Sequence, residues 1–289
     1  MKTVNSLSGG QTSSYIAANY PSDYNVFSLV RTNDKKLLYP DKKLRQIVSD
    51  KIGQEFIGTL EEDVIIHTML DLEQYIGKEI TWVSGPTFDD VIKRQGGETT
   101  YLPNTTQRFC TQMMKLDPIF NWWRKTFDMA PVEMRIGYRA NEGRRARTMI
   151  DNMNKDGVLE YKAIVGKRGG VTGQNKWAMI PWQIPRWPLI EDQIFKDTIV
   201  NYWKDKPVRF AYMNNCIGCF HRNAVLLKHM SVRHPKKYQW FVDQEIEAGK
   251  SGSRTFKNGI SYEKIRKSFE QITMFDDDFN DCDSGYCGV

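Results

Sequence analysis

The sequence predicts an α/β protein with an open, mostly parallel sheet, helices on both faces of that sheet, and a helical C-terminal region. Two observations predict this fold. Short apolar segments typical of buried strands alternate with segments of helical periodicity through the first half of the chain. A glycine pair, Gly9-Gly10, stands where the first strand passes into the first helix, and such loops bind phosphate groups in α/β proteins.

The first element is encoded by MKTVNSLSGGQTSSYIAANYP, in which a strand around Val4 precedes the glycines and a short helix ends before Pro21. Glycines can adopt positive φ and let backbone N–H groups converge on one anion. The loop expected to hold that anion comprises Ser8, Gly9, Gly10, Gln11, Thr12 and Ser13. Alternatively, the glycines form an ordinary turn, and Thr12 or Ser13 merely caps the helix.

Further strands are expected at 26–30, 79–84 and 132–140, and helices through Lys51, at 55–77 and at 118–127. Because ligands of open parallel sheets bind beyond the carboxyl ends of the strands, the segments after these strands should meet at one edge. One of them, GYRANEGRRARTM, is rich in arginine. By itself such a run is as consistent with a solvated surface as with an anion site.

The chain of 289 residues has 41 lysines and arginines against 35 acidic residues, a formal charge of +6. This excess is compatible with a nucleotide or nucleic-acid substrate but does not require one. No apolar run approaches the roughly 20 residues that span a bilayer, and residues 1–20 do not resemble a signal peptide. We therefore expect a cytoplasmic protein without a membrane partner.

Residues 151–187 lack clear periodicity and are expected to form a mobile loop or lid, or a disordered insertion. Helical segments are expected from Pro188 to about Gly249, with breaks near Pro207 and at CIGC. The chain then ends in the acidic segment MFDDDFNDCDSGYCGV.

Five cysteines are present, and Cys216 and Cys219 have the spacing at which two thiolates bind one zinc ion or iron–sulfur cluster. Cys110 lies in RFCTQMMK, where positive neighbours favour its thiolate form. Cys282 or Cys287 could complete a set of four ligands. The alternative is that Cys110 is a small buried hydrophobe and the tail cysteines are free. His221 is expected to neighbour such a site rather than to bind the metal.

Four segments together resemble the phosphoadenosine phosphosulfate reductase family of the PP-loop (adenine nucleotide alpha hydrolase-like) superfamily. They are SGGQTS at 8–13, RFCTQMMKLDP at 108–118, IGYRANEGRR at 136–145, and the stretch from WPLI to CIGCFHR at 187–222. The resemblance implies a PP-loop domain over residues 1–249, followed by a C-terminal helix and an acidic cysteine-containing tail over residues 250–289.

The resemblance also implies a site. An adenine nucleotide (phosphoadenosine phosphosulfate, adenosine phosphosulfate or ATP) would place its anionic end over the glycine loop. The basic residues around that end would be Arg108, Lys115, Arg139 and Arg145. The ligands of a 4Fe–4S cluster or zinc would be Cys110, Cys216, Cys219 and Cys287. The last of these is alternatively the catalytic nucleophile.

The sequence departs from the family at three places. Thr12 stands where ATP-using members usually have aspartate, Cys110 stands where cluster-bearing reductases have paired cysteines, and Cys287 lacks the flanking glutamate and histidine of a reductase tail. We expect sulfonucleotide reduction, with thioredoxin or glutaredoxin as partner. The alternatives are an ATP-dependent adenylating enzyme for sulfur insertion into nucleic acid and a nucleotide-binding subunit without turnover.

Overall fold

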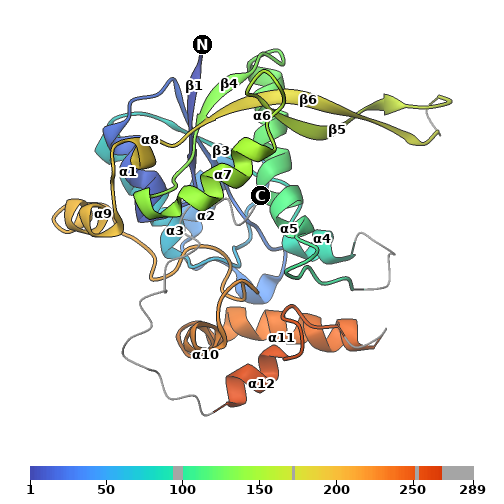
Figure 1. Cartoon of the computed structure of the whole chain (residues 1–289). Helices are drawn as coiled ribbons and strands as arrows, with labels where there is room; N and C mark the ends of the chain where they lie inside the picture. The colour runs from blue at the N-terminus through green and yellow to red at the C-terminus, as the bar shows by residue number, and fades with distance from the viewer. Residues whose placement is uncertain (94–99, 171–172, 251–253, 269–289) are drawn as a thin grey trace.

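A six-stranded, mostly parallel open sheet forms the centre of the computed structural model, which describes residues 1–93, 100–170, 173–250 and 254–268 (Figure 1). The strand order is β3-β2-β1-β4-β6-β5, and only β5 runs antiparallel to its neighbour. The strands are β1 (Thr3–Leu7), β2 (Tyr24–Ser28), β3 (Ile80–Val83), β4 (Val132–Arg135), β5 (Leu159–Lys167) and β6 (Asn175–Arg186). The expected α/β architecture is therefore confirmed.

Side chains alternate between the two faces of the sheet, and each face has its own core. Leu7 and Phe27 pack against the helices α1 (Gln11–Asn19) and α3 (Val64–Ile76). Val4 and Val26 pack with α6 (Asp117–Thr126) on the opposite face. The period of two along each strand produces this division, and it buries all four of these side chains. Helices on both faces are thus confirmed.

The remaining helical elements connect the strands or follow the sheet. Those before β5 are η1 (Lys35–Leu37), α2 (Lys42–Ile52), α4 (Phe88–Lys93), α5 (Phe109–Thr111), η2 (Gln112–Leu116), η3 (Ala140–Glu142) and α7 (Gly143–Asp151). Those after β6 are α8 (Pro188–Glu191), α9 (Lys196–Trp203), α10 (Ala224–Arg233), α11 (Pro235–Gly249) and α12 (Tyr262–Lys267).

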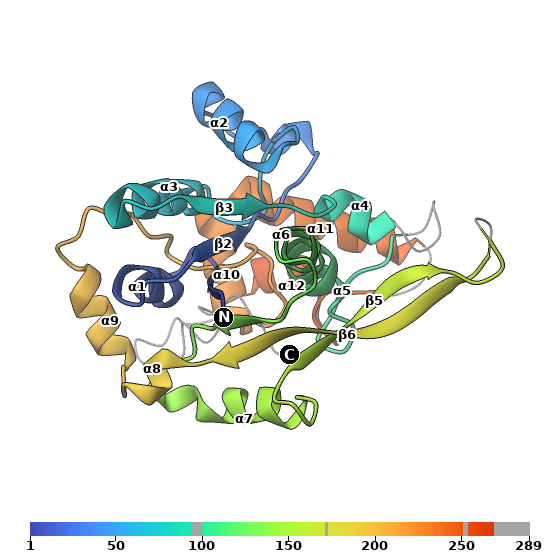
Figure 2. The same ribbon diagram turned by 90° about the horizontal axis from the view of Figure 1, so that it is seen from above.

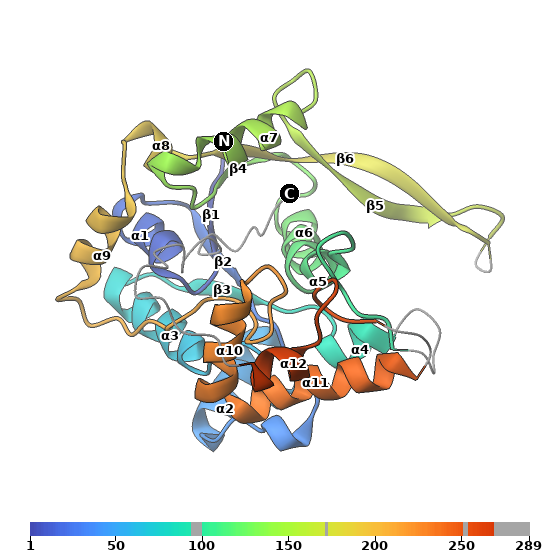
Figure 3. The same cartoon turned by 60° about the horizontal axis from the view of Figure 1, so that its bottom comes forward.

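Helices α10, α11 and α12 form the expected helical C-terminal region and pack against one another (Figure 3). They lie on the side of the sheet toward which the carboxyl ends of β1 and β2 point (Figure 1). Their core contains Tyr238, Phe241, Phe256 and Tyr262, and it also includes Phe88 of α4. Among the described residues, no helix has both the length and the apolar composition needed to cross a bilayer.

Three expectations about secondary structure are wrong. The strand expected at 132–140 ends at Arg135, because the chain then turns tightly, with the N–H of Tyr138 donating to the Ile136 carbonyl. Most of the segment expected to be irregular, residues 151–187, is instead β5 and β6, which pair as a long antiparallel hairpin (Figure 2). Its outer half is exposed on both strands, apolar side chains such as Ile164 and Trp177 included, so it lacks the buried apolar face that marks a half-buried strand. The helix expected at 55–77 begins only at Val64, since the preceding residues form a buried acidic loop.

Candidate functional site

The glycine loop joins β1 to α1 and has a different conformation at each glycine. Gly9 has φ +83°, as expected. A Cβ there would lie 2.7 Å from Cγ2 of Ile65, so Gly9 also allows the loop to pack closely on α3. Gly10 is the N-cap of α1 with φ −100° and ψ 162°, an extended conformation open to any residue. The expectation of positive φ at Gly10 is therefore wrong.

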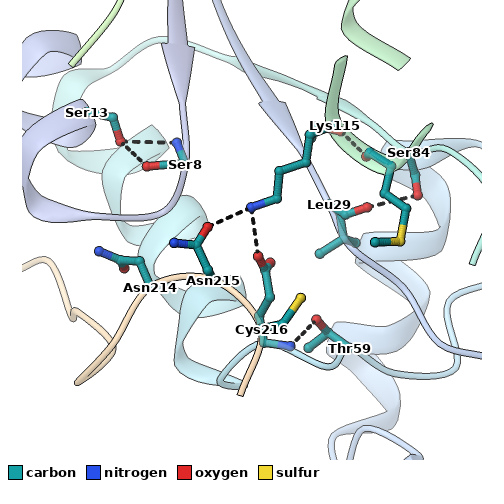
Figure 4. A network of polar contacts seen from close by, with 12 residues as sticks. Ser8, Ser13, Leu29, Thr59, Ser84, Lys115, Asn214, Asn215 and Cys216 are labelled. Carbon is teal, nitrogen blue, oxygen red and sulfur yellow. Dashed lines mark hydrogen bonds and ion pairs between the residues drawn. The ribbon is translucent and has the colours of Figure 1, made fainter. Parts of the chain in front are cut away.

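Ser13 holds the loop together through its side chain (Figure 4). Its Oγ accepts a hydrogen bond from the Ser8 N–H at 3.1 Å and donates to the Gly10 carbonyl at 3.2 Å. No side chain caps α1 within the described part of the chain, so the interpretation of Thr12 or Ser13 as a simple N-cap is wrong. The positive end of α1 thus points its first-turn backbone N–H groups into the loop without a capping side chain.

The arginine-rich segment reaches this loop because β4 pairs directly with β1. A Cβ on Gly137 would lie 3.4 Å from Cγ2 of Thr12 and 3.5 Å from the backbone nitrogen of Ser13. The chain after β4 therefore touches the first turn of α1. Parallel strand order alone brings together two segments that lie more than a hundred residues apart in the sequence.

Arg139 and Arg145 share one carboxylate. Glu142 Oε2 accepts from Nε of Arg139 at 3.0 Å, and Glu142 Oε1 accepts from Nη1 of Arg145 at 2.6 Å. The Arg145 guanidinium also lies 4.3 Å from the ring centre of Tyr138. Glu142 therefore holds the two guanidinium groups in one arrangement, and guanidinium groups are the side chains that bind phosphate and sulfate through paired hydrogen bonds.

Lys115 lies in the π-helical turn η2 and points toward the residues before α3 and after α9 (Figure 4). Its Nζ donates to Oε1 of Glu61 at 3.2 Å and to Oδ1 of Asn215 at 3.0 Å. Glu61 is 1% exposed, and its second oxygen, Oε2, has no hydrogen-bond partner within the described residues. Sequence reasoning missed both Glu61 and Asn215, whose partners come from distant segments.

The segment that contains Asn215 lines two neighbouring pockets. A pocket of about 300 Å³ beside the glycine loop is lined by Gln11, Thr12, Lys196 and Asn214, among others. The next residue, Asn215, lines a second pocket together with Lys115 and three cysteines. The Asn214-Asn215 pair therefore borders the glycine loop on one side and the cysteines on the other.

The second pocket, which we call the cysteine pocket, contains Cys110, Cys216 and Cys219. Burial raises the pKa of Cys110 to about 12, and the neighbouring Cys219 adds to this shift. Burial likewise raises the pKa of Cys216 well above its usual value, with a smaller contribution from Glu61. The expectation of a thiolate at Cys110 is therefore wrong for the protein without a bound metal, because desolvation outweighs the attraction of Lys115.

His221 also lines the cysteine pocket, and its Nε2 is buried without a hydrogen-bond partner within the described residues. Burial lowers its pKa, as do the positive charges of Arg108 and Lys257. The imidazole is thus held neutral, with an unused nitrogen, close to three thiols. The charge of Arg108, a residue expected around the anionic end of the nucleotide, thus acts on His221 of the cysteine pocket.

The cysteines converge without forming a closed metal site from the described residues. Cys110, Cys216 and Cys219 share one pocket, yet the described residues contain no group of three His, Cys, Asp or Glu side chains arranged to hold a metal ion. The expected fourth ligand or nucleophile, Cys287, lies outside the described residues, as does Cys282. Three sulfur donors and a neutral imidazole are nevertheless the donor types that iron–sulfur clusters and zinc prefer.

Comparison of the chain with protein-family models, with curated proteins and with solved structures finds no match in any of the three. The resemblance to the phosphoadenosine phosphosulfate reductase family therefore depends on the four sequence segments alone.

Proposed function

We propose that this protein is a PP-loop enzyme that binds an adenine nucleotide and reduces a sulfonucleotide in the cytoplasm. One observation carries the proposal: the glycine loop contacts the segment that bears Arg139 and Arg145 at the carboxyl ends of two adjacent parallel strands. In the resemblance these two segments surround the anionic end of the nucleotide. The Asn214-Asn215 pair then leads from that place to the cysteine pocket.

In this proposal the phosphates lie at the N-terminus of α1, where backbone N–H groups and the helix dipole favour negative charge. Arg139 and Arg145, held by Glu142, neutralise the charge that develops on the leaving nucleotide. Lys115 lies between Glu61 and Asn215, on the path toward the cysteines, where it would meet the sulfate end.

The chemical step assigned to Cys287 is nucleophilic. Its thiolate would attack the sulfur of adenosine phosphosulfate or phosphoadenosine phosphosulfate, so that an S–S bond forms while the bond from sulfur to the phosphate oxygen breaks. The nucleotide would leave with that electron pair. A dithiol of thioredoxin or glutaredoxin would then reduce the cysteine thiosulfonate, release sulfite and become a disulfide.

Cys110, Cys216 and Cys219 would hold the 4Fe–4S cluster or zinc, with Cys287 as fourth ligand if it is not the nucleophile. Such a group would supply positive charge beside the sulfate. Metal analysis and an absorption spectrum of protein purified without oxygen test this part. Cys287→Ser should lose the metal if Cys287 is a ligand, and should keep both metal and nucleotide if Cys287 is the nucleophile.

Calorimetric titration with adenosine phosphosulfate, phosphoadenosine phosphosulfate, ATP and adenosine tests nucleotide binding. Gly10→Val should greatly reduce affinity for the anionic nucleotides. The extended backbone accepts valine, and a bulky residue at the N-cap of α1 would hinder the approach of phosphates to the first N–H groups of the helix. The matched control is Gly166→Val in β5, where an added Cβ meets nothing within 4 Å. Unchanged affinity in folded Gly10→Val protein would refute the nucleotide site.

A second candidate is an ATP-dependent adenylating enzyme that prepares nucleic acid for sulfur insertion. The β5–β6 hairpin favours it, because this exposed element is rich in lysine and arginine. The products separate the candidates: sulfite release indicates the reductase, and pyrophosphate release from ATP indicates the adenylating enzyme. If neither product forms although nucleotide binds, the protein is a nucleotide-binding subunit without turnover.

A further inference from the structure

The β5–β6 hairpin extends well beyond the sheet from which it starts. β4 pairs with β6 only from Gln183 to Arg186, while β5 and β6 remain paired with each other out to Lys167 and Asn175. In Figures 1, 2 and 3 the outer part of this hairpin projects from the body of the protein. We call the described residues of this outer part, 161–170 and 173–179, the arm.

One face of the arm carries large apolar side chains in contact with solvent. Ile164 pairs with Trp177 and Lys162 pairs with Met179, so these four residues share a face. Ile164, Trp177 and Met179 are 44%, 49% and 54% exposed. Nζ of Lys162 lies 5.7 Å from the ring centre of Trp177. The same strands therefore present a flat aromatic ring with a cation directly beside it.

The charge of the arm has a single sign. Residues 161–179 include Lys162, Lys167, Arg168 and Lys176 but no aspartate or glutamate. A second copy of this chain would bring another arm of the same charge against it, and the two would repel each other. The complementary partner is a polyanion that also offers apolar surface to Trp177.

We propose that the arm binds single-stranded nucleic acid. Lysines and arginine contact phosphates, while bases stack on Trp177 and contact Ile164 and Met179. A duplex offers phosphates at its surface but keeps its bases stacked on one another, so it would leave these three apolar side chains without a partner. The inference extends beyond the nucleotide site and does not depend on it, since the arm and the glycine loop share no residue.

Fluorescence anisotropy with labelled 20-nucleotide single strands of DNA and of RNA, and with the matching duplex, tests the proposal. We expect both the wild-type protein and Gly10→Val to bind a single strand more tightly than the duplex. Trp177→Ala should weaken single-strand binding by about 5- to 160-fold, the range of losses when one base loses its aromatic partner. Its control is Ile246→Ala on α11, where the side chain is 60% exposed.

The salt dependence tests the phosphate contacts separately. Lys162→Gln with Lys176→Gln should make the slope of log affinity against log salt shallower by about 1.4, since each phosphate contact on a single strand contributes about 0.7. The control with the same change of charge is Lys42→Gln with Lys43→Gln, at the exposed start of α2. Equal affinities of the arm variants and their controls, or tighter binding of the duplex, would overturn the proposal. So would wild-type self-association that Trp177→Ala abolishes in sedimentation experiments.

Discussion

Gly9→Ala should destabilise the fold by two separable effects. Gly9 has φ +83°, and an L-residue in the left-handed region costs about 1–2 kcal/mol. The added Cβ would also lie 2.7 Å from Cγ2 of Ile65. Since Ile65 is 0% exposed, it has little room to move, and overpacking of this kind costs about 1–3 kcal/mol. The expected loss is therefore about 2–5 kcal/mol in the free energy of unfolding.

Urea denaturation followed by circular dichroism measures this loss, and Gly157→Ala separates its parts. Gly157 has φ +74°, but a Cβ there meets nothing within 4 Å. Its variant should lose only the conformational contribution of about 1–2 kcal/mol. In the double variant Gly9→Ala with Ile65→Ala, the clash is relieved, so the combined loss should be smaller than the sum of the two single losses by about 1–3 kcal/mol.

Equal losses for Gly9→Ala and Gly157→Ala, together with additive losses in the double variant, would refute the packing role of Gly9. The result also bears on the nucleotide site. The sequence alone suggests that either glycine can be replaced to remove nucleotide binding without affecting the fold. Gly9 is unsuited to that test, because its replacement also disturbs the contact between the loop and α3. Gly10 is the better choice, because its extended backbone accepts other residues.

Three further outcomes are expected. Arg139→Ala and Arg145→Ala should each weaken binding of anionic nucleotide by about 1.5–3 kcal/mol in titration calorimetry, with little effect on adenosine. Glu142→Gln removes the negative charge that both arginines share, so the loss of this charge should not weaken nucleotide binding. Equal losses for nucleotide and adenosine would contradict the proposed role of the arginines. Burial raises the pKa of Cys110 to about 12, so little reactive thiolate is present at pH 8. Its reaction with iodoacetamide, followed by mass spectrometry, should be at least about 100-fold slower in the native protein than after unfolding. Equal rates would contradict the burial of Cys110. Burial raises the pKa of Glu245 from 4.5 to about 7, although the backbone N–H groups of two residues donate to its carboxylate. Between these two pH values the folded state binds a proton that the unfolded state has lost, so the free energy of unfolding should fall as pH rises from about 4.5 to 7, by at most about 1.4 kcal/mol per pH unit. Urea midpoints should show this slope in the wild type and a shallower slope in Glu245→Gln.

The sequence by itself determined the elements of the sheet and the position of the glycine loop. Strand and helix periods are local properties, and the segments around Val4, Val26 and Met134 show them over a few residues each. The alternation of these segments with helices was enough to predict a parallel sheet and to place the loop and the arginine segment at one edge.

Only the tertiary structure decided what individual site residues contact. Lys115 bonds Glu61 and Asn215, which lie 54 and 100 residues away along the chain, and no local pattern marks such pairs. Gly9 packs so closely against Ile65 that a Cβ would clash with it. Burial is the main cause of the raised pKa of Cys110. The β5–β6 hairpin was not predicted for a related reason. The outer parts of its strands pair with each other and bury neither face, so the sequence there shows no regular alternation of buried apolar and exposed polar residues.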